Sequence, residues 1–125
     1  MSGLSPTLFQ VVGGLETFRQ LVDAFYRGVE SDPLLRPMYP VDLTESREHL
    51  TLFLAQYFGG PTTYSEQRGH PRLRMRHLPF TIDAAARDAW LKHMRAGVDE
   101  TAIPEPARGV LLEYFSGTAS FLVNT

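Results

Sequence analysis

The chain has 125 residues, of which 43% are hydrophobic and 21% are charged. This length favours a single domain over residues 1–125, because two cores would leave each half with too little buried surface. The balance of apolar and charged residues is typical of a folded chain and excludes the apolar-poor composition of disordered proteins. The formal net charge of -2 provides no global basic field to hold a nucleic acid, so no nucleic-acid partner is expected.

The chain contains no cysteine, which excludes disulfides, thiolate nucleophiles and cysteine-ligated zinc or iron–sulfur sites. Residues 1–10 lack the basic start and the apolar core of a signal peptide. No apolar run reaches the length of a membrane span, so no membrane partner is expected either. Together these features predict a cytoplasmic protein.

The first strong helical signal covers Leu15–Glu30, where apolar side chains recur three and four residues apart. Proline biases the preceding residue away from helical geometry, so Pro33 is expected to interrupt this pattern. Residues 34–38 then form a single turn at a corner of the chain. The predicted apolar stripe consists of Phe18, Val22, Phe25, Tyr26 and Val29.

A second long helix is predicted to begin at Thr44, because Thr44, Glu45 and Glu48 are typical of a helix N-terminus. The Gly-Gly-Pro sequence at residues 59–61 ends it. Its buried face consists of Leu50, Phe53, Leu54 and Tyr57.

Residues 62–80 lose this periodicity and are expected to form a loop. The exception is a short helix over residues 71–77, where Pro71 suits the first turn and Pro79 follows the end. A loop of this length inside a compact domain is usually functional or disordered.

Two further helices complete an all-α prediction. Asp83 is placed to cap a helix that ends near Val98, with Ala86, Trp90 and Met94 along one side. A last helix is expected to start near residues 104–106, and no pair of strands competes with it. Its apolar face consists of Leu111, Tyr114, Phe115, Thr118 and Leu122.

The common enzyme motifs are absent from the sequence. No pair among the four histidines has the spacing of a zinc hydrolase, and no phosphate-binding loop, nucleophile elbow or dinucleotide motif is present. Haem requires less, because one neutral imidazole can hold the iron from one side. His77 ends the short helix among apolar neighbours, but a lone histidine at such a spacing is more often a satisfied or exposed side chain than a metal ligand.

A longer sequence pattern distinguishes between these interpretations of His77. Gly-Gly-Pro at residues 59–61 is followed at residues 64–77 by Tyr-Ser-Glu-Gln-Arg-Gly-His-Pro-Arg-Leu-Arg-Met-Arg-His. Glycines at 13–14, Phe-Tyr at 25–26, Pro-Met-Tyr-Pro at 37–40 and Arg-Asp-Ala-Trp-Leu at 87–91 accompany it. This combination closely resembles the group II truncated haemoglobins, over nearly the whole chain.

The resemblance implies a truncated globin fold, in which two helices pack over two around haem b (protohaem with its iron) and the first helix is nearly absent. It implies His77 as the iron ligand and places Tyr26, Tyr39 and Trp90 around bound dioxygen. Each of these three side chains buries an aromatic body and keeps a polar group that needs a partner, although a single such residue is more often core filler. The position of the family's small-residue gate resembles Ser46, the alternative being an exposed serine. The chain has one residue fewer between Tyr39 and the helix than the family pattern, which leaves a neighbouring residue open as the gate.

Further residues are expected to contact the haem. At least one arginine among Arg68, Arg72, Arg74 and Arg76 is expected to meet a propionate, the alternative being a solvated face. The chain has His49 where the family often has an arginine, and Phe58 where tryptophan is frequent. The predicted contacts are Leu50, Phe53, Leu54, Tyr57, Tyr64, Arg68, His70, Leu73, Arg76, Phe80 and Met94.

These expectations lead to a haem protein that binds dioxygen and other diatomic ligands, with redox or detoxifying chemistry on nitric oxide or peroxide as its use. Such turnover requires electrons from a reductase that the sequence does not identify. Oxygen storage, transport or sensing is the alternative within haem chemistry. The alternative of another class is a haem-free helical interaction module.

Overall fold

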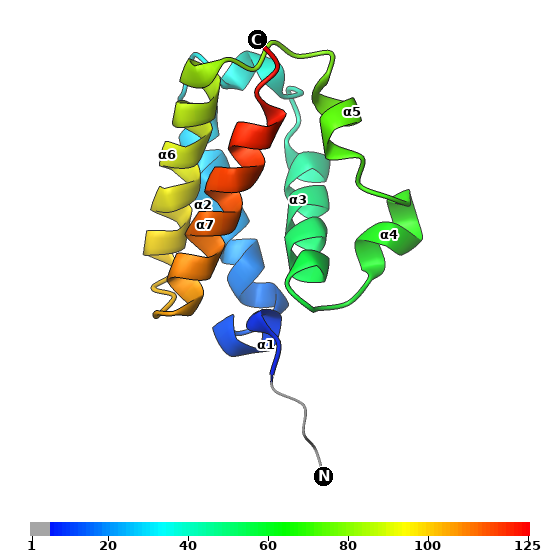
Figure 1. The fold of residues 1–125 in the computed structure, drawn as a ribbon, viewed down its shortest axis with the longest axis vertical. Helices are drawn as coiled ribbons and strands as arrows, with labels where there is room; N and C mark the ends of the chain where they lie inside the picture. Colours follow the sequence, from blue (N-terminus) through cyan, green and yellow to red (C-terminus); the bar gives the residue numbers. More distant parts are fainter. Residues whose placement is uncertain (1–5) are drawn as a thin grey trace.

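The computed structural model describes residues 6–125, and within this range it contains helices and no strands (Figure 1). The all-α prediction is therefore confirmed for this part of the chain. Residues 1–5 of the predicted single domain lie outside the described residues. The helices are α1 (Leu8–Val12), α2 (Leu15–Glu30), the 3-10 helix η1 (Arg36–Met38), α3 (Thr44–Tyr57), α4 (Thr63–Arg68), α5 (Leu73–His77), α6 (Ala84–Glu100) and α7 (Ala107–Leu122).

The four long helices form two layers. Helix α2 packs against both α3 and α6, and α6 packs against α7, so the pair α2–α3 faces the pair α6–α7. The short helices α4 and α5 lie outside α3 in Figure 1, and α5 also contacts α7. The apolar stripe predicted for α2 forms the centre of the core, where Phe18, Val22 and Phe25 are fully buried. Burial of each such side chain stabilises the fold by about 1.5–3 kcal/mol.

Helices α2 and α6 approach closely because two glycines lie between them. A Cβ atom at Gly97 of α6 would lie 2.8 Å from the backbone oxygen of Leu21. A Cβ atom at Gly28 of α2 would overlap the imidazole of His93, whose Nε2 pairs with Asp32 Oδ2 at 2.6 Å. The absence of a side chain at Gly28 and Gly97 therefore sets the distance between the two layers.

The starts of α6 and α3 compare differently with their sequence signals. Asp83 Oδ1 accepts a hydrogen bond from the Ala86 N–H at 2.8 Å and caps α6 as predicted. Thr44, in contrast, is the first residue of α3 and makes no capping bond through its side chain. Asp42 Oδ1 accepts from the Thr44 N–H at 2.9 Å instead, because its side chain lies two residues closer to the corner.

The structure of residues 62–80 differs from the prediction, which was a loop with one short helix. It contains α4, which is held to α3 by Gln56: the amide oxygen accepts from the Ser65 N–H at 2.9 Å, and the amide nitrogen lies 2.7 Å from Ser65 Oγ. Helix α5 begins at Leu73, since Arg72 adopts a left-handed φ of 47°. Pro71 therefore precedes the helix and does not lie in its first turn.

No helix among residues 6–125 has both the length and the apolar character that a membrane crossing requires.

The close α2–α6 contact can be tested by adding one methyl group. We expect Gly97→Ala to lower the free energy of unfolding by about 1–3 kcal/mol, because its Cβ meets the backbone of Leu21, which cannot move aside cheaply. Gly117→Ala in α7 is the matched control. Apart from its chain neighbours and the backbone of α7, no atom of residues 6–125 lies within 4 Å of its Cβ, so this substitution should raise the stability by about 0.5–1 kcal/mol. Urea unfolding of both variants measures the difference, and equal effects would contradict the interpretation.

Candidate functional site

A cavity of about 440 Å³ opens between the two layers and the short helix α5. Its volume lies within the range of about 300–1,000 Å³ that is usual for small-molecule and cofactor sites. Most of its wall is apolar or aromatic, with a few polar groups contributed by different helices. The predicted site residues that line it are Tyr26, Tyr39, Ser46, Leu50, Phe53, Leu54, Tyr64, Arg68, Leu73, Arg76, His77, Phe80 and Trp90.

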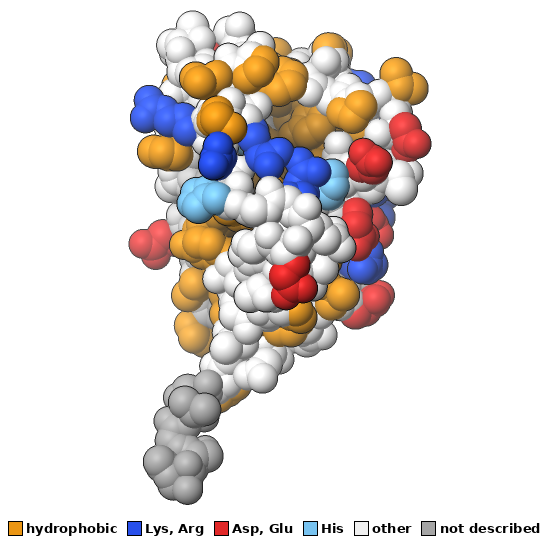
Figure 2. Space-filling view, turned by 90° about the vertical axis from the view of Figure 1, so that its right-hand side faces the viewer, with side chains coloured by type: hydrophobic (Ala, Val, Ile, Leu, Met, Phe, Trp, Pro, Cys, Tyr) orange, Lys and Arg blue, Asp and Glu red, His pale blue; other side chains and the backbone are white. Residues whose placement is uncertain are grey.

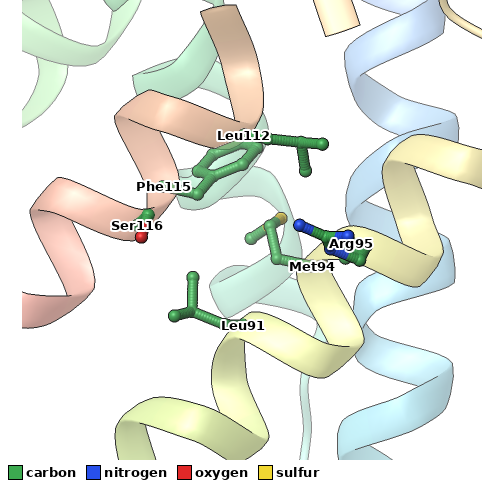
Figure 3. A pocket seen from close by; sticks show the side chains of 6 residues that line it. All are labelled: Leu91, Met94, Arg95, Leu112, Phe115 and Ser116. Carbon is green, nitrogen blue, oxygen red and sulfur yellow. The ribbon is translucent and has the colours of Figure 1, made fainter. Parts of the chain in front are cut away.

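Three residues that we expected to contact haem lie outside this cavity. Tyr57 is 56% exposed and its ring packs on Tyr114, with the two centroids 4.1 Å apart. His70 is exposed, and its Nδ1 accepts from the Arg72 N–H at 3.0 Å. Met94 is fully buried one turn beyond Trp90, between α6 and α7. There it lines a separate pocket of about 70 Å³ (Figure 3).

One wall of the cavity was not assigned to the site from the sequence. The C-terminal half of α7 contributes Phe115, Thr118, Ala119 and Leu122 at helical spacing. This periodicity was visible in the sequence as an apolar face, and only its role was missed. Other lining residues that were not predicted are Leu35, Met38, Pro40, His49, Ile82, Ala86, Arg87 and Tyr114.

The imidazole of His77 is held in one tautomer. Its Nδ1 lies 2.5 Å from the carbonyl oxygen of Leu73, and a carbonyl only accepts hydrogen bonds. Nδ1 therefore carries the proton, which leaves the lone pair of Nε2 free in the neutral ring. Asn124 Nδ2 donates to the carbonyl oxygens of His77 and Phe80 at 3.4 and 2.9 Å, and so ties the end of α5 to the end of α7.

Three polar aromatic side chains come together from α2, the corner after η1, and α6. The rings of Tyr26 and Tyr39 meet edge to face with centroids 5.6 Å apart. Phe25 contacts both Tyr26 and Trp90, with centroid separations of 5.0 and 5.5 Å. The fully buried Phe25 therefore fixes the positions of two of the three polar aromatics.

The environment of the two tyrosines keeps them protonated. Burial is the largest cause of the raised pKa of Tyr26, and hydrogen bonding to Ser46 opposes it. Burial raises the pKa of Tyr39 to about 12, against a smaller opposite effect of hydrogen bonding to Trp90. Both phenols are thus neutral at physiological pH and keep an O–H that can donate to a ligand.

The mouth of the cavity is cationic. Arg68, Arg76 and Arg87 line it, and no carboxylate does so among the described residues. Arg68 Nη1 donates to His49 Nε2 at 3.1 Å, and burial followed by the nearby Arg68 charge lowers the pKa of His49. Arg68 Nε is buried and has no hydrogen-bond partner within residues 6–125. Figure 2 shows basic side chains crossing this face beside an apolar hollow.

These features fit the chemistry of a haem group. The free Nε2 of His77 suits an iron ligand, and the apolar walls suit a porphyrin ring. The partnerless Nε of Arg68 and the cations around it suit the two carboxylates on the edge of a haem.

Comparison with known proteins identifies the family. The model of the bacterial-like globin family matches residues 7–124. The group 2 truncated haemoglobin YjbI of Bacillus subtilis is 46% identical over 111 residues, which cover 89% of this chain and 84% of that protein. A haemoglobin structure from Chloroflexus aurantiacus superimposes with a TM-score of 0.95 at 55% identity and covers 97% of this chain and 100% of its own.

A third comparison places the chain within a subgroup. The structure of the group II truncated haemoglobin from Bacillus anthracis superimposes with a TM-score of 0.94 at 42% identity and covers 98% of this chain and 94% of its own. The chain therefore belongs to the bacterial-like globin family as a group II truncated haemoglobin, a family whose haem iron binds diatomic ligands such as dioxygen.

Proposed function

We propose that this chain holds haem b through His77 and retains dioxygen for redox or detoxifying chemistry on nitric oxide or peroxide. The observation that carries the proposal is the two-sided cavity. On one side, the Nδ1 bond to Leu73 leaves His77 Nε2 free. On another, Tyr26, Tyr39 and Trp90 supply hydrogen-bond donors. Haem supplies an iron centre that binds a diatomic ligand and exchanges single electrons.

Different residues of the chain would hold different parts of the cofactor. Leu50, Phe53 and Leu54 of α3 would cover the porphyrin with apolar surface and exclude water, while Arg68 and Arg76 of the mouth would pair with its carboxylates. Ser46 is the small residue beside Tyr26 and leaves a passage for diatomic ligands. The same cationic mouth favours haem over a neutral ligand.

The three donors determine how long a diatomic ligand stays. A bound diatomic ligand with partial negative charge would accept a charge-assisted bond worth about 1.5–3 kcal/mol from each of these side chains that reaches it. Each bond slows escape by roughly ten- to hundredfold if it must break first. Two such bonds favour chemistry on the retained ligand over its delivery, because delivery requires release.

The two alternatives make different demands on the same pocket. Oxygen storage, transport or sensing requires the same haem but no oxidising activity. A haem-free interaction module requires none of the features that fit haem, and it leaves the buried Arg68 Nε without a role. The visible spectrum of the purified protein separates the second alternative from the proposal.

The role of His77 can be tested by removing its side chain. We expect His77→Gly to lose stable haem binding and to regain it with added imidazole, because His70 is exposed outside the cavity and His49, which lines it, has its Nε2 hydrogen-bonded to Arg68. Haem titration followed by the visible spectrum is the measurement. His70→Gly is the matched control and should bind haem normally. The assignment is wrong if His70→Gly loses haem and His77→Gly does not.

The role of Trp90 can be tested by replacing the indole with a phenyl ring. Trp90→Phe keeps most of the aromatic bulk and removes the N–H donor, so oxygen dissociation should become roughly tenfold faster. Tyr26→Phe should have a smaller effect or the opposite one, because Tyr39 lies beside it and can donate in its place. Stopped-flow release from both single variants and the double variant measures the coupling. Tyr57→Phe, outside the cavity, is the control, and an unchanged rate in Trp90→Phe would count against the indole.

The redox use can be tested on the oxygenated protein itself. We expect slow oxygen release, rapid oxidation of the oxygenated protein by nitric oxide, and peroxide-dependent oxidation of a dye that falls in Trp90→Phe. The reason is that the donors hold and polarise the ligand that reacts. Fast release with negligible activity in both assays would leave transport or storage as the better account.

A further inference from the structure

The basic residues of this chain are unevenly distributed along the sequence. Residues 67–82 contain four of its 12 lysines and arginines and none of its 14 aspartates and glutamates. The rest of the chain is correspondingly acidic. The region around α5 is thus a local basic surface on a protein of net negative charge.

Helix α5 has two different faces. Leu73, Arg76 and His77, at helical spacing, line the cavity. Arg74, Met75 and Leu78 do not line it and lie open to solvent. Met75 is 53% exposed and Leu78 is 63% exposed, so this face of α5 presents apolar side chains to solvent.

The exposed face continues onto neighbouring segments. Phe121 of α7 is 55% exposed, and the guanidinium carbon of Arg74 lies 5.3 Å from the centre of its ring. Arg72 is exposed at the start of α5. We call this set the outer α5 surface. It consists of Arg72, Arg74, Met75, Leu78 and Phe121.

The charges of the outer α5 surface have no acidic partner within residues 6–125. Five arginines elsewhere pair with carboxylates, whereas Arg72 and Arg74 pair with none among the described residues. Arg68 and Arg76 face the cavity, where the proposed haem carboxylates would neutralise them. Arg72 and Arg74 do not line the cavity, so a bound haem would leave them free for an external acidic group. Arginine, methionine and aromatic residues together are also the types enriched in protein interfaces.

We propose that the outer α5 surface docks an acidic electron-transfer protein of the [2Fe–2S] ferredoxin type. The proposal rests on the proposed function, because redox chemistry at haem requires a source of electrons. The reduced cluster gives up one electron and is oxidised, while the iron of the haem passes from ferric to ferrous, and no bond forms or breaks. A single-electron carrier matches this single-electron change.

The position of the surface suits electron transfer. An α-helix with its side chains is about 10–12 Å across, so a protein on the outer face of α5 lies roughly one helix diameter from the cavity. Leu78 of the surface follows His77 directly in the sequence. Carboxylates around the partner's cluster would meet Arg72 and Arg74, while Met75, Leu78 and Phe121 supply apolar contact.

The test compares two charge-reversed variants of the haem-loaded protein. Arg72→Glu with Arg74→Glu changes the surface. Lys92→Glu with Arg95→Glu makes the same change of charge at exposed residues of α6, which lies on the far side of the molecule from α5 in Figure 1. The probe is a purified plant-type [2Fe–2S] ferredoxin. Its dissociation constant is measured by NMR titration at several salt concentrations, and its reduction of the ferric protein by stopped flow.

We expect Arg72→Glu with Arg74→Glu to weaken binding and slow reduction by roughly tenfold or more, and the α6 variant to change both by less than about twofold. Reduction by dithionite, which needs no docking, should be equal in all proteins. Arg72→Gln with Arg74→Gln is a milder change and should give an intermediate loss of ferredoxin binding. It keeps the test possible if the charge-reversed variant misfolds.

Several outcomes would overturn the proposal. Equal losses in the two charge-reversed variants would show a long-range effect of net charge, and unchanged binding would exclude the surface. If the Arg72 and Arg74 changes abolish binding to phosphatidylserine vesicles, to single-stranded RNA or to a second copy of this chain, and leave ferredoxin binding intact, the surface serves that partner instead. Failure to bind haem, seen in the visible spectrum, would contradict the proposed function. If the protein binds no haem, the docking surface is still supported when the Arg72 and Arg74 changes weaken ferredoxin binding in the NMR titration and the α6 changes do not.

Discussion

The close packing of α2 against α6 is the constraint on which the site depends. Because Gly97 lets the two backbones approach, Phe25 of α2 reaches Trp90 of α6 and also contacts Tyr26 on its own helix. Two of the proposed ligand-binding groups are therefore held by the centre of the hydrophobic core. Polar groups positioned in this way are rigid, since moving either one requires repacking of fully buried side chains.

The opposite side of the cavity is built on another principle. Helices α4 and α5 are too short to be stable by themselves. They are held in place by individual side-chain bonds, from Gln56 to Ser65 and from Asn124 to the carbonyls that follow α5. The cavity thus has one wall fixed by the core and another fixed by a few polar ties. The second wall carries His77, and local opening is expected there before it occurs among the long helices.

Sequence patterns predicted the parts of the fold that repeat over many residues. The bounds of α2 follow from its apolar stripe, and Asp83 marks the start of α6. Helix α4 was missed because six residues give no usable period and its stability comes from contact with α3. The site itself needed the family resemblance. Even then Tyr57, His70 and Met94, which we expected to contact haem, do not line the cavity, since helical spacing does not say which neighbour a side chain meets.

Because Gly28 packs against His93, the residues at these two positions are expected to change together. Any side chain at position 28 would overlap the imidazole, and the imidazole is itself held by Asp32. Replacement of helical glycine by alanine is a common route to thermostable variants, but at this position a single replacement works against the fold. A library for redesign should therefore vary both positions together. Among natural relatives, a larger residue at position 28 is expected to occur with a smaller one at position 93.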